Sequence, residues 1–437
     1  MTHRALPTAT EPDGAPRLPL LDVLRGVAIL AILFMNIEAM GGPFNALLLG
    51  DPRLLGWTGL DRVAWWAKDV IAEGTARCLL EMLFGAGMVI LTERAAMRLD
   101  ERRVLRAYAW RNIVLFLFGL LHVFVLLWPG DILHTYALAA LVAMTFRRLR
   151  PRLLLVIGLA MATAQLVGGA AGYVATTSHR SAAIELRHRQ AAGAALSAPE
   201  RDELATVAAR QAERAIDRRQ AAAAVAAENS ARTGDAAGWV TSLWAVFLKV
   251  QAMGIEPLLV WEAASTMLIG AGLFKLGILQ GDRSRRFYAL LALTGYGLGL
   301  PLRVWSAFER TRFDDLPRLG FAFAEYARLL ITLGHVGLIA ALLASAAGAR
   351  LLRPLRAAGR AALTLYVLQT IATMWMIYPP WGLALYGRQG WAALMATALA
   401  VNAVLLVLAV WWTRRFAIAP VEWAWRSIVA GRRLGWR

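Results

Sequence analysis

The sequence predicts an all-α fold: a polytopic membrane helix bundle with about ten transmembrane helices and one helical polar loop. Of the 437 residues, 59% are hydrophobic, and the mean hydropathy is +0.52. Several apolar runs approach the roughly 20 residues that a helix needs to cross the hydrocarbon core of a bilayer. These runs extend from residue 20 to residue 412 with one long polar interruption, which favours a single membrane domain over several soluble ones.

Charge and cysteine content exclude other classes of protein. The formal net charge is +18, but the basic residues stand in short clusters between the apolar runs. A nucleic-acid-binding protein would gather them on one face or tail, so the pattern predicts the lipid bilayer, and no nucleic acid, as a partner. Cys78 is the only cysteine in the sequence. An internal disulfide or a thiolate metal site therefore cannot form, and no metal is predicted.

The predicted spans divide the chain into three parts. Residues 1–19 are polar and rich in proline, which is typical of a disordered tail, here cytoplasmic. Residues 20–412 form the transmembrane helical domain, with a polar helical extracytoplasmic insertion at 176–238. Residues 413–437 form a basic cytoplasmic tail. The first apolar run is longer than the hydrophobic region of a signal peptide, so we expect it to be retained as the first helix.

Ten spans satisfy the length criterion in chain order. They cover roughly residues 20–40, 70–92, 109–129, 131–147, 152–174, 255–279, 286–308, 321–347, 360–378 and 391–412.

Arginine-rich short loops fix the expected orientation. The turns RRLRPR at 147–152 and DRSRR at 282–286 alternate with the arginine-poor turns WPGD at 128–131 and PPWGLALYGRQG at 379–390. The positive-inside rule then places both termini of this multi-pass protein in the cytoplasm. One turn, ERTRFDDLPR at 309–318, carries basic residues on the outer side and departs from the rule.

The polar insertion is rich in Ala, Arg, Glu and Gln, and this composition has high helix propensity. It is interpreted either as a solvated helical excursion or as a lid over an outward-facing site.

Polar residues inside the spans are the candidate functional groups, because an ionisable side chain in lipid needs a partner, a cavity or a pathway. In the first span, Asp22, Arg25 and Asn36 fall within about a 60° sector of the helix. The helix rise separates Asp22 from Asn36 by about 21 Å, so one face carries polar groups near both membrane surfaces. An i,i+3 ion pair between Asp22 and Arg25 explains the inner end as well as a binding site does.

The second span places Glu73, Arg77 and Glu81 at i, i+4 and i+8. Successive ion pairs could neutralise them along the helix, while Gly85 allows close helix packing. Glu81, near the middle of the span, is the member expected to be protonated or functional.

Histidines frame the turn between the third and fourth spans. His122 lies within the membrane, and Asp131 and His134 follow beside the outer surface at i,i+3. Asp131 could simply be a helix N-cap. A histidine within reach of a carboxylate is also the simplest general-base arrangement. Both interpretations remain open for this sequence.

Further ionisable groups recur in the outer half of the later spans and suggest a polar cavity that opens outward. We include them as candidate substrate-binding residues together with Asp22, Arg25 and Glu81: they are Glu262, Arg303, Glu325, Arg328 and His335. Glu325 and Arg328 can pair on one helix, and a lone histidine such as His335 is often a hydrogen-bonded core residue.

Five motifs carry a resemblance to a known family. LDVLRGVAILAILFMN at 21–36, EMLFGAGMVI at 81–90, WPGDILHTYAL at 128–138, GRAALTLYVLQT at 359–370 and APVEWAWR at 419–426 resemble the YeiB-like family of bacterial inner-membrane proteins. The C-terminal half of that family is a domain of unknown function. The resemblance covers nearly the whole chain in order. Leu365 stands where the family often carries Asn.

The opening stretch is also similar to the first span of transmembrane acyltransferases such as heparan-alpha-glucosaminide N-acetyltransferase. The resemblance implies transfer of an acyl group from coenzyme A on the cytosolic face to a sugar on the far side, with Asn36 in the active site. The catalytic base of those enzymes is a His in the following loop, but no His occurs here between Asn36 and Cys78. Either His122 or His134 has taken over this role, or the scaffold persists without the reaction.

These observations leave functions of different classes open. In the first, acyl-coenzyme A is the donor, and an envelope glycan, lipid or small molecule is the acceptor. His134 or His122, assisted by Asp131, is the base, and Asn36 stabilises the oxyanion. In the second, a proton-coupled transporter or exporter of a small envelope metabolite uses Glu81, Glu262 and the histidines. A scaffold for envelope assembly is a third, and self-association into a homo-oligomer stays open.

Overall fold

The computed structural model describes residues 18–314 and 316–436. Most of the predicted N-terminal tail, residues 1–17, lies outside this described part. Within it, eight helical segments are long and apolar enough to cross a membrane. They are α1 (Pro19–Gly41), α3 and α4 together (Gly59–Ala67 and Thr75–Ala96), α5 (Glu101–Phe124), α7 (Pro151–Ala191), α10 (Glu256–Lys275), α11 (Arg285–Arg310), α12 (Gly320–Leu343) and α16 (Trp391–Arg415).

Two shorter apolar helical segments complete the set. α6 (Leu133–Ala143) continues into the 3₁₀ turn η3 (Met144–Phe146), and α15 (Ala362–Thr370) continues into the π-helical segment η4 (Ile371–Ile377). The eight long and two short segments follow the ten predicted spans in order, so the all-α polytopic bundle is confirmed. The chain is a multi-pass membrane protein.

The remaining helices lie between the spans or at their ends. They are α2 (Phe44–Leu49), η1 (Pro52–Leu55), η2 (Lys68–Ala72), α8 (Ala198–Thr233), α9 (Ala236–Ala252), α13 (Ala346–Leu351), α14 (Arg353–Arg360) and α17 (Pro420–Ala430).

The boundaries of two predicted spans were wrong. The prediction placed Glu73 inside one continuous helix at 70–92, but a π-helical segment ends at Ala72 and α4 begins only at Thr75. Gly74 between them has a φ of 71°, a left-handed conformation that glycine adopts at little cost. Glu73 therefore does not lie on the same helix as Arg77. The predicted span 152–174 is only the first part of the 41-residue α7.

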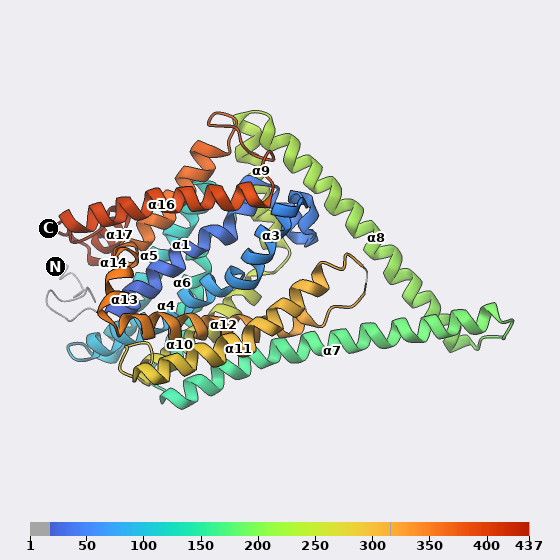
Figure 1. The fold of residues 1–437 in the computed structure, drawn as a ribbon, viewed down its shortest axis with the longest axis horizontal. Helices are drawn as coiled ribbons and strands as arrows, with labels where there is room; N and C mark the ends of the chain where they lie inside the picture. The colour runs from blue at the N-terminus through green and yellow to red at the C-terminus, as the bar shows by residue number, and fades with distance from the viewer. Residues whose placement is uncertain (1–17, 315, 437) are drawn as a thin grey trace.

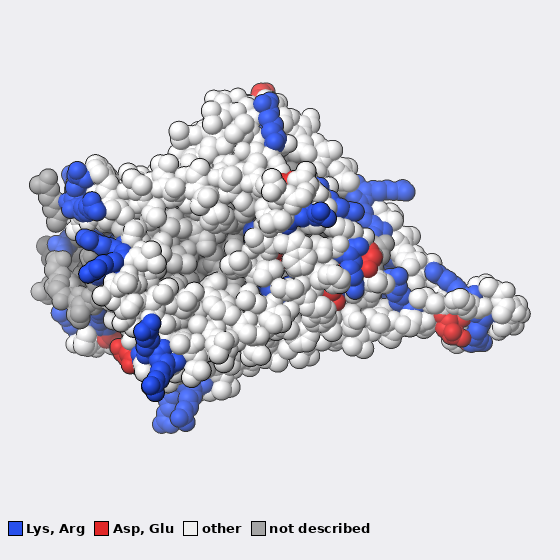
Figure 2. Space-filling model, viewed as in Figure 1, with Lys and Arg blue, Asp and Glu red and all other residues white. Residues whose placement is uncertain are grey.

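Both ends of the described chain lie at one end of the bundle. The start of α1 and the C-terminal α17 are neighbours at the left of Figure 1, while the far ends of α7 and α8 meet at the right. The space-filling view shows Lys and Arg at both ends and a largely uncharged zone between them (Figure 2). This distribution is typical of a bundle whose middle lies in hydrocarbon.

The predicted polar stretch 176–238 is helical. α7 continues far beyond the length of one span, and α8 returns from its tip to the bundle (Figure 1). A capping box between Ser197 and Glu200 starts α8, whose alanine-rich sequence favours a long helix. Near the tip, the His179 Nδ1 atom lies 2.6 Å from Glu203 Oε1 and pairs the two helices.

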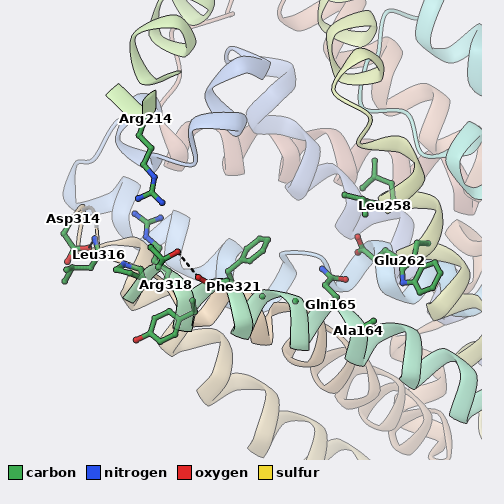
Figure 3. Close-up of a pocket in the computed structure, with 17 residues that line it drawn as sticks. Ala164, Gln165, Arg214, Leu258, Glu262, Asp314, Leu316, Arg318 and Phe321 are labelled. Carbon is green, nitrogen blue, oxygen red and sulfur yellow. Dashed lines mark hydrogen bonds between the residues drawn. The ribbon is translucent and has the colours of Figure 1, made fainter. Parts of the chain in front are cut away.

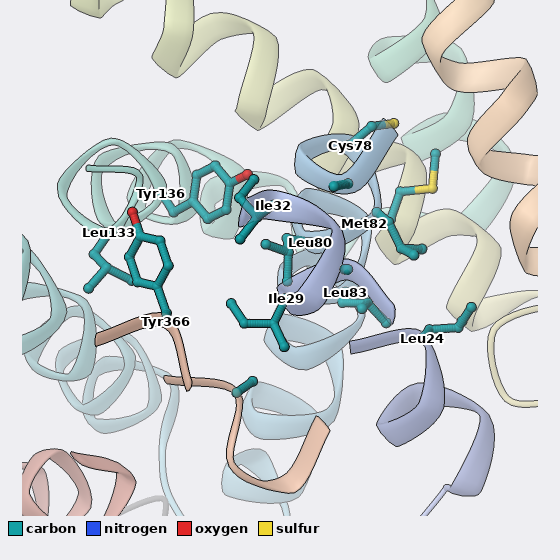
Figure 4. Close-up of a cluster of buried hydrophobic side chains, with 14 of the residues drawn as sticks. Leu24, Ile29, Ile32, Cys78, Leu80, Met82, Leu83, Leu133, Tyr136 and Tyr366 are labelled. Carbon is teal, nitrogen blue, oxygen red and sulfur yellow. The ribbon is translucent and has the colours of Figure 1, made fainter. Parts of the chain in front are cut away.

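The start of the first family motif packs closely against α14. A Cβ atom added at Gly26 would lie 1.9 Å from the Leu355 carbonyl oxygen, and one at Gly359 would lie 1.7 Å from the Asp22 carbonyl oxygen. α1 and α14 therefore touch backbone to backbone, which only glycine permits. The core continues along α1, where Ile29 and Ile32 face Leu80, Tyr136 and Tyr366 (Figure 4).

Candidate functional site

A buried carboxylate joins the two predicted histidines. Asp131 follows the turn after α5, with its Oδ1 atom 2.7 Å from Nδ1 of His122 and its Oδ2 atom 2.9 Å from Nδ1 of His134. Its Oδ2 atom also accepts a hydrogen bond from the His134 backbone N–H at 3.0 Å. Asp131 thus caps the start of α6 and contacts both imidazole rings, so the predicted cap and the predicted contact between a histidine and a carboxylate both form.

The partners of His122 define its tautomer. An ionised carboxylate only accepts hydrogen bonds, so Nδ1 of His122 carries the proton that it donates to Asp131. The other nitrogen, Nε2, lies 2.8 Å from the Thr370 hydroxyl and is left as the acceptor in the neutral ring. The sequence of contacts is carboxylate, imidazole, hydroxyl, which is the arrangement of a general base and its substrate group.

His134 has a different environment. Its Nε2 atom lies 3.5 Å from Oε2 of Glu256, and the other oxygen of that carboxylate accepts a hydrogen bond from Thr135 Oγ1 at 2.7 Å. With a carboxylate at each ring nitrogen, His134 is placed to carry both protons as an imidazolium. Its charge then offsets part of the charge of Asp131 and Glu256. His122 is the better placed of the two histidines to accept a proton.

This histidine cluster is buried. The exposed fraction is 1% for His122, 4% for Asp131 and 6% for His134. Gly119 on α5 makes room for it, because a Cβ atom there would lie 2.7 Å from Asp131 Oδ2. Tyr366 and Thr370 come from the GRAALTLYVLQT motif, which sequence reasoning did not connect with the histidines because nothing in the local pattern shows that the segments meet.

A second cluster joins the predicted charged residues of three helices. The Arg328 guanidinium lies 3.0 Å from Glu81 Oε2, 2.8 Å from Glu262 Oε1 and 2.7 Å from Glu325 Oε1. Arg77 lies 2.5 Å from Glu262 and 3.6 Å from Glu81. Arg328 also donates to the Thr266 hydroxyl at 3.1 Å. The predicted pair between Glu325 and Arg328 forms, and the pairing of Arg77 with Glu81 forms within α4.

The predicted pairing of Glu73 with Arg77 is replaced by another ion pair. Glu73 Oε2 lies 2.5 Å from Lys68 Nζ, which also lies 2.7 Å from Glu38 Oε1. Arg303 donates to the Glu73 backbone carbonyl at 2.9 Å. Sequence reasoning missed Glu38 and Lys68, although a glutamate two residues after Asn36 in an apolar run was a sufficient signal.

The three polar residues of the first span stand near the two ends of α1. Arg25 NH1 is 3.5 Å from Asp22 Oδ1, and Arg356 on α14 lies 3.8 Å from the same carboxylate. The start of α1 is therefore an ion-pair cluster where α1 meets α14. Asn36 is half-buried and follows Ile32 by one turn, on the helix face that Ile29 and Ile32 turn toward Tyr136 and Tyr366 (Figure 4).

His335 does not join either cluster. Its Nδ1 atom lies 2.7 Å from the Tyr296 hydroxyl, between α12 and α11. It is a hydrogen-bonded histidine of the helix interface. Nowhere in residues 18–314 and 316–436 do three or more His, Cys, Asp or Glu side chains form a group suited to a metal ion.

One large cavity reaches the arginine and glutamate cluster. Its volume is about 1020 Å³, and it lies between α7, α8, α10 and the turn before α12. Glu262 lines it at one end and Arg214 and Arg318 at the other (Figure 3). Glu262 therefore belongs both to the ion-pair cluster and to the lining of this cavity.

The fold and these clusters define a multi-pass membrane protein with ionisable groups enclosed between its helices. Residues 273–432 match the family model described as "Protein of unknown function (DUF418)". The uncharacterized protein YxaH of Bacillus subtilis is 28% identical over 420 residues, which is 94% of this chain and 94% of that protein. The uncharacterized protein YeiB of Escherichia coli is 27% identical over 423 residues, 93% and 95% of the two chains.

A third, shorter similarity is to an uncharacterized 39.9 kDa protein of Bacillus acidopullulyticus, at 30% identity over 134 residues, 31% of this chain and 35% of that one. No solved structure matches the chain. The end-to-end similarities confirm that the chain resembles the YeiB-like family, as the five motifs predict.

Proposed function

We propose that this protein is a membrane acyltransferase that uses His122 as its general base. The observation that carries the proposal is the contact chain from Asp131 through His122 to Thr370, at 2.7 and 2.8 Å. Asp131 holds the tautomer, and the Thr370 hydroxyl marks the position that an acceptor hydroxyl or amine would take at Nε2.

The reaction would run in two steps. As the acceptor oxygen or nitrogen attacks the thioester carbonyl of an acyl-coenzyme A donor, Nε2 of His122 takes its proton. The tetrahedral intermediate then expels the coenzyme A thiolate, which recovers that proton from His122. Asn36 is the group on α1 that would donate a hydrogen bond to the oxyanion. The proposed donor approaches from the end of the bundle that holds the chain termini, near Arg25, and the acceptor is an envelope glycan, lipid or small molecule.

The test uses the full-length protein in proteoliposomes with acetyl-coenzyme A and an envelope extract as acceptor. General acid–base catalysis supplies about 10²–10⁴ in rate, so His122→Ala should reduce acyl transfer by at least about 100-fold. His335→Ala is the matched control, because it removes another membrane histidine outside the cluster, and it should keep the activity. Binding of the thioester should survive His122→Ala. Absence of thioester binding in the wild type would rule the proposal out.

A transporter is the second candidate, and a different observation favours it. The cluster of Arg77, Glu81, Glu262 and Arg328 meets a large cavity, as the proton or solute site of a transporter would. Glu262→Gln should then abolish solute-dependent proton flux in proteoliposomes while leaving acyl transfer intact. A flux that Glu262→Gln leaves unchanged would count against transport through this cavity.

A further inference from the structure

The cavity beside Glu262 has two chemically distinct ends. One end is lined mainly by apolar residues, among them Leu258, Trp261 and the α7 residue Ala164, with Gln165 and Glu262 beside them. At the other end, the guanidinium groups of Arg214 and Arg318 point toward one another from α8 and from the turn before α12 (Figure 3). Like charges that converge in this way repel, so an anion between them would be favoured.

The two carboxylates that line the cavity do not cancel this charge. Glu262 lies within ion-pair distance of Arg77 and Arg328, at 2.5 and 2.8 Å. Asp314 lies 3.3 Å from Arg312. Each acid already faces an arginine other than Arg214 and Arg318. The main partners of an anion in the cavity would therefore be the guanidinium groups of Arg214 and Arg318.

The position of the cavity relates it to the bilayer surface. It follows α7 from Ala164 to Thr176, a length of about 18 Å at 1.5 Å per residue. A span that starts at Pro151 leaves the hydrocarbon core after about 20 residues, close to the middle of this stretch. The apolar end thus lies at the depth of lipid chains, and the arginine end lies at the depth of headgroups.

Two glycines keep this space open. Gly168 and Gly172 line the cavity, and a Cβ atom added at either would have no neighbour within 4 Å. Neither glycine is needed for close helix packing, unlike Gly169, where a Cβ atom would lie 2.9 Å from Ala322 Cα. A larger side chain at Gly168 would occupy the cavity without displacing the surrounding helices.

We infer that this cavity binds an anionic membrane lipid, with its phosphate between Arg214 and Arg318 and a hydrocarbon chain along Leu258 and Trp261. The inference also explains the turn at 309–318, which breaks the positive-inside rule. Arg310 of that turn pairs with Asp69 and Arg312 with Asp314, whereas Arg318 lines the cavity. The inference does not depend on acyl transfer.

The experiment measures lipid binding to the full-length protein by native mass spectrometry in detergent. The probes are dioleoyl phosphatidylglycerol, zwitterionic dioleoyl phosphatidylcholine and inorganic phosphate. The wild type should bind phosphatidylglycerol at least tenfold more tightly than phosphatidylcholine. Arg214→Ala with Arg318→Ala should remove this preference, and Gly168→Leu should weaken the binding of both lipids.

Matched controls separate the site from general effects. Arg210→Ala is the control for the arginine variants, because it removes a charge from α8 one turn before Arg214, outside the cavity lining. Gly297→Leu is the control for Gly168→Leu, because it adds the same side chain at an open glycine on α11. Both should bind lipid as the wild type does, and so should His122→Ala. Equal binding of the two lipids by the wild type would overturn the inference. Inorganic phosphate that competes as strongly as the lipid would also overturn it, since the site would then be a simple anion site.

Discussion

At the scale of single residues, the chain encloses charges that compensate one another only as groups. Arg328 faces three carboxylates at once, those of Glu81, Glu262 and Glu325. Its exposed fraction is 3%, so water cannot replace the guanidinium. Removing one member of a buried ion-pair group leaves the other charges uncompensated. The resulting loss of folding free energy is larger than the net stabilisation that the intact group provides.

This arrangement predicts that a second substitution in the cluster will restore part of the stability that the first one removes. Arg328→Met should destabilise the protein by about 3–5 kcal/mol, because three carboxylates remain without their shared partner. Glu81→Gln added to Arg328→Met should recover part of the loss by removing one of these charges. The measurement is unfolding in detergent by a graded denaturant. Equal destabilisation by the single and the double variant would contradict the prediction.

Single residues also show where sequence reasoning stops. Asp131 and His134 are three positions apart, so their contact could be predicted from helix geometry. His122 and Thr370 are 248 positions apart, and their hydrogen bond depends on how α5 and α15 meet. Periodicity reports which face of one helix is polar, but not which other helix that face meets. Sequence reasoning therefore selected polar residues within the spans, but it did not give the residues of other helices that they contact.

At the scale of elements, the family motifs correspond to contacts between helices. Glu422 of the APVEWAWR motif accepts hydrogen bonds from the backbone N–H groups of Leu363 and Thr364 and, at 2.5 Å, from the Thr364 hydroxyl. It thus satisfies the free N–H groups at the start of α15 from a different helix, α17. The ten spans could be counted from hydropathy, but such a cap between remote segments could not be anticipated.

Burial raises the pKa of the Glu422 carboxyl above its ordinary value, despite the hydrogen bonds to it. The folded protein then binds this proton more tightly than the unfolded chain. The contribution of Glu422 to stability is therefore present at low pH and is lost as the pH rises through the raised pKa. Glu422→Gln keeps an acceptor oxygen and should flatten this dependence. The measurement is the free energy of unfolding in detergent as a function of pH. It starts at about pH 4, close to the ordinary pKa of glutamate. An identical slope in both proteins would refute the assignment.

At the scale of the whole molecule, both ends of the described chain share one side and the tip of α7 and α8 lies at the other (Figure 1). If the chain ends face the cytoplasm, as the arginine-rich loops predict, that tip faces outward. Cysteine scanning in a Cys78→Ala background tests this. Ala192→Cys at the tip should react with a membrane-impermeant maleimide in intact cells, and Ser427→Cys on α17 should react only after lysis. The reverse pattern would invert the orientation.

At the end of the bundle where α1 finishes, residues of α8 satisfy backbone groups of α1 and α2. Arg232, near the end of α8, donates hydrogen bonds to the carbonyls of Ala39, Met40 and Gly42, where α1 ends. Its neighbour Glu228 accepts from the backbone N–H groups of Phe44 and Asn45, where α2 begins. The first span is thus finished by residues made roughly 190 positions later in the chain. During synthesis, the carbonyl groups at the end of α1 can therefore accept these hydrogen bonds only after α8 has been made.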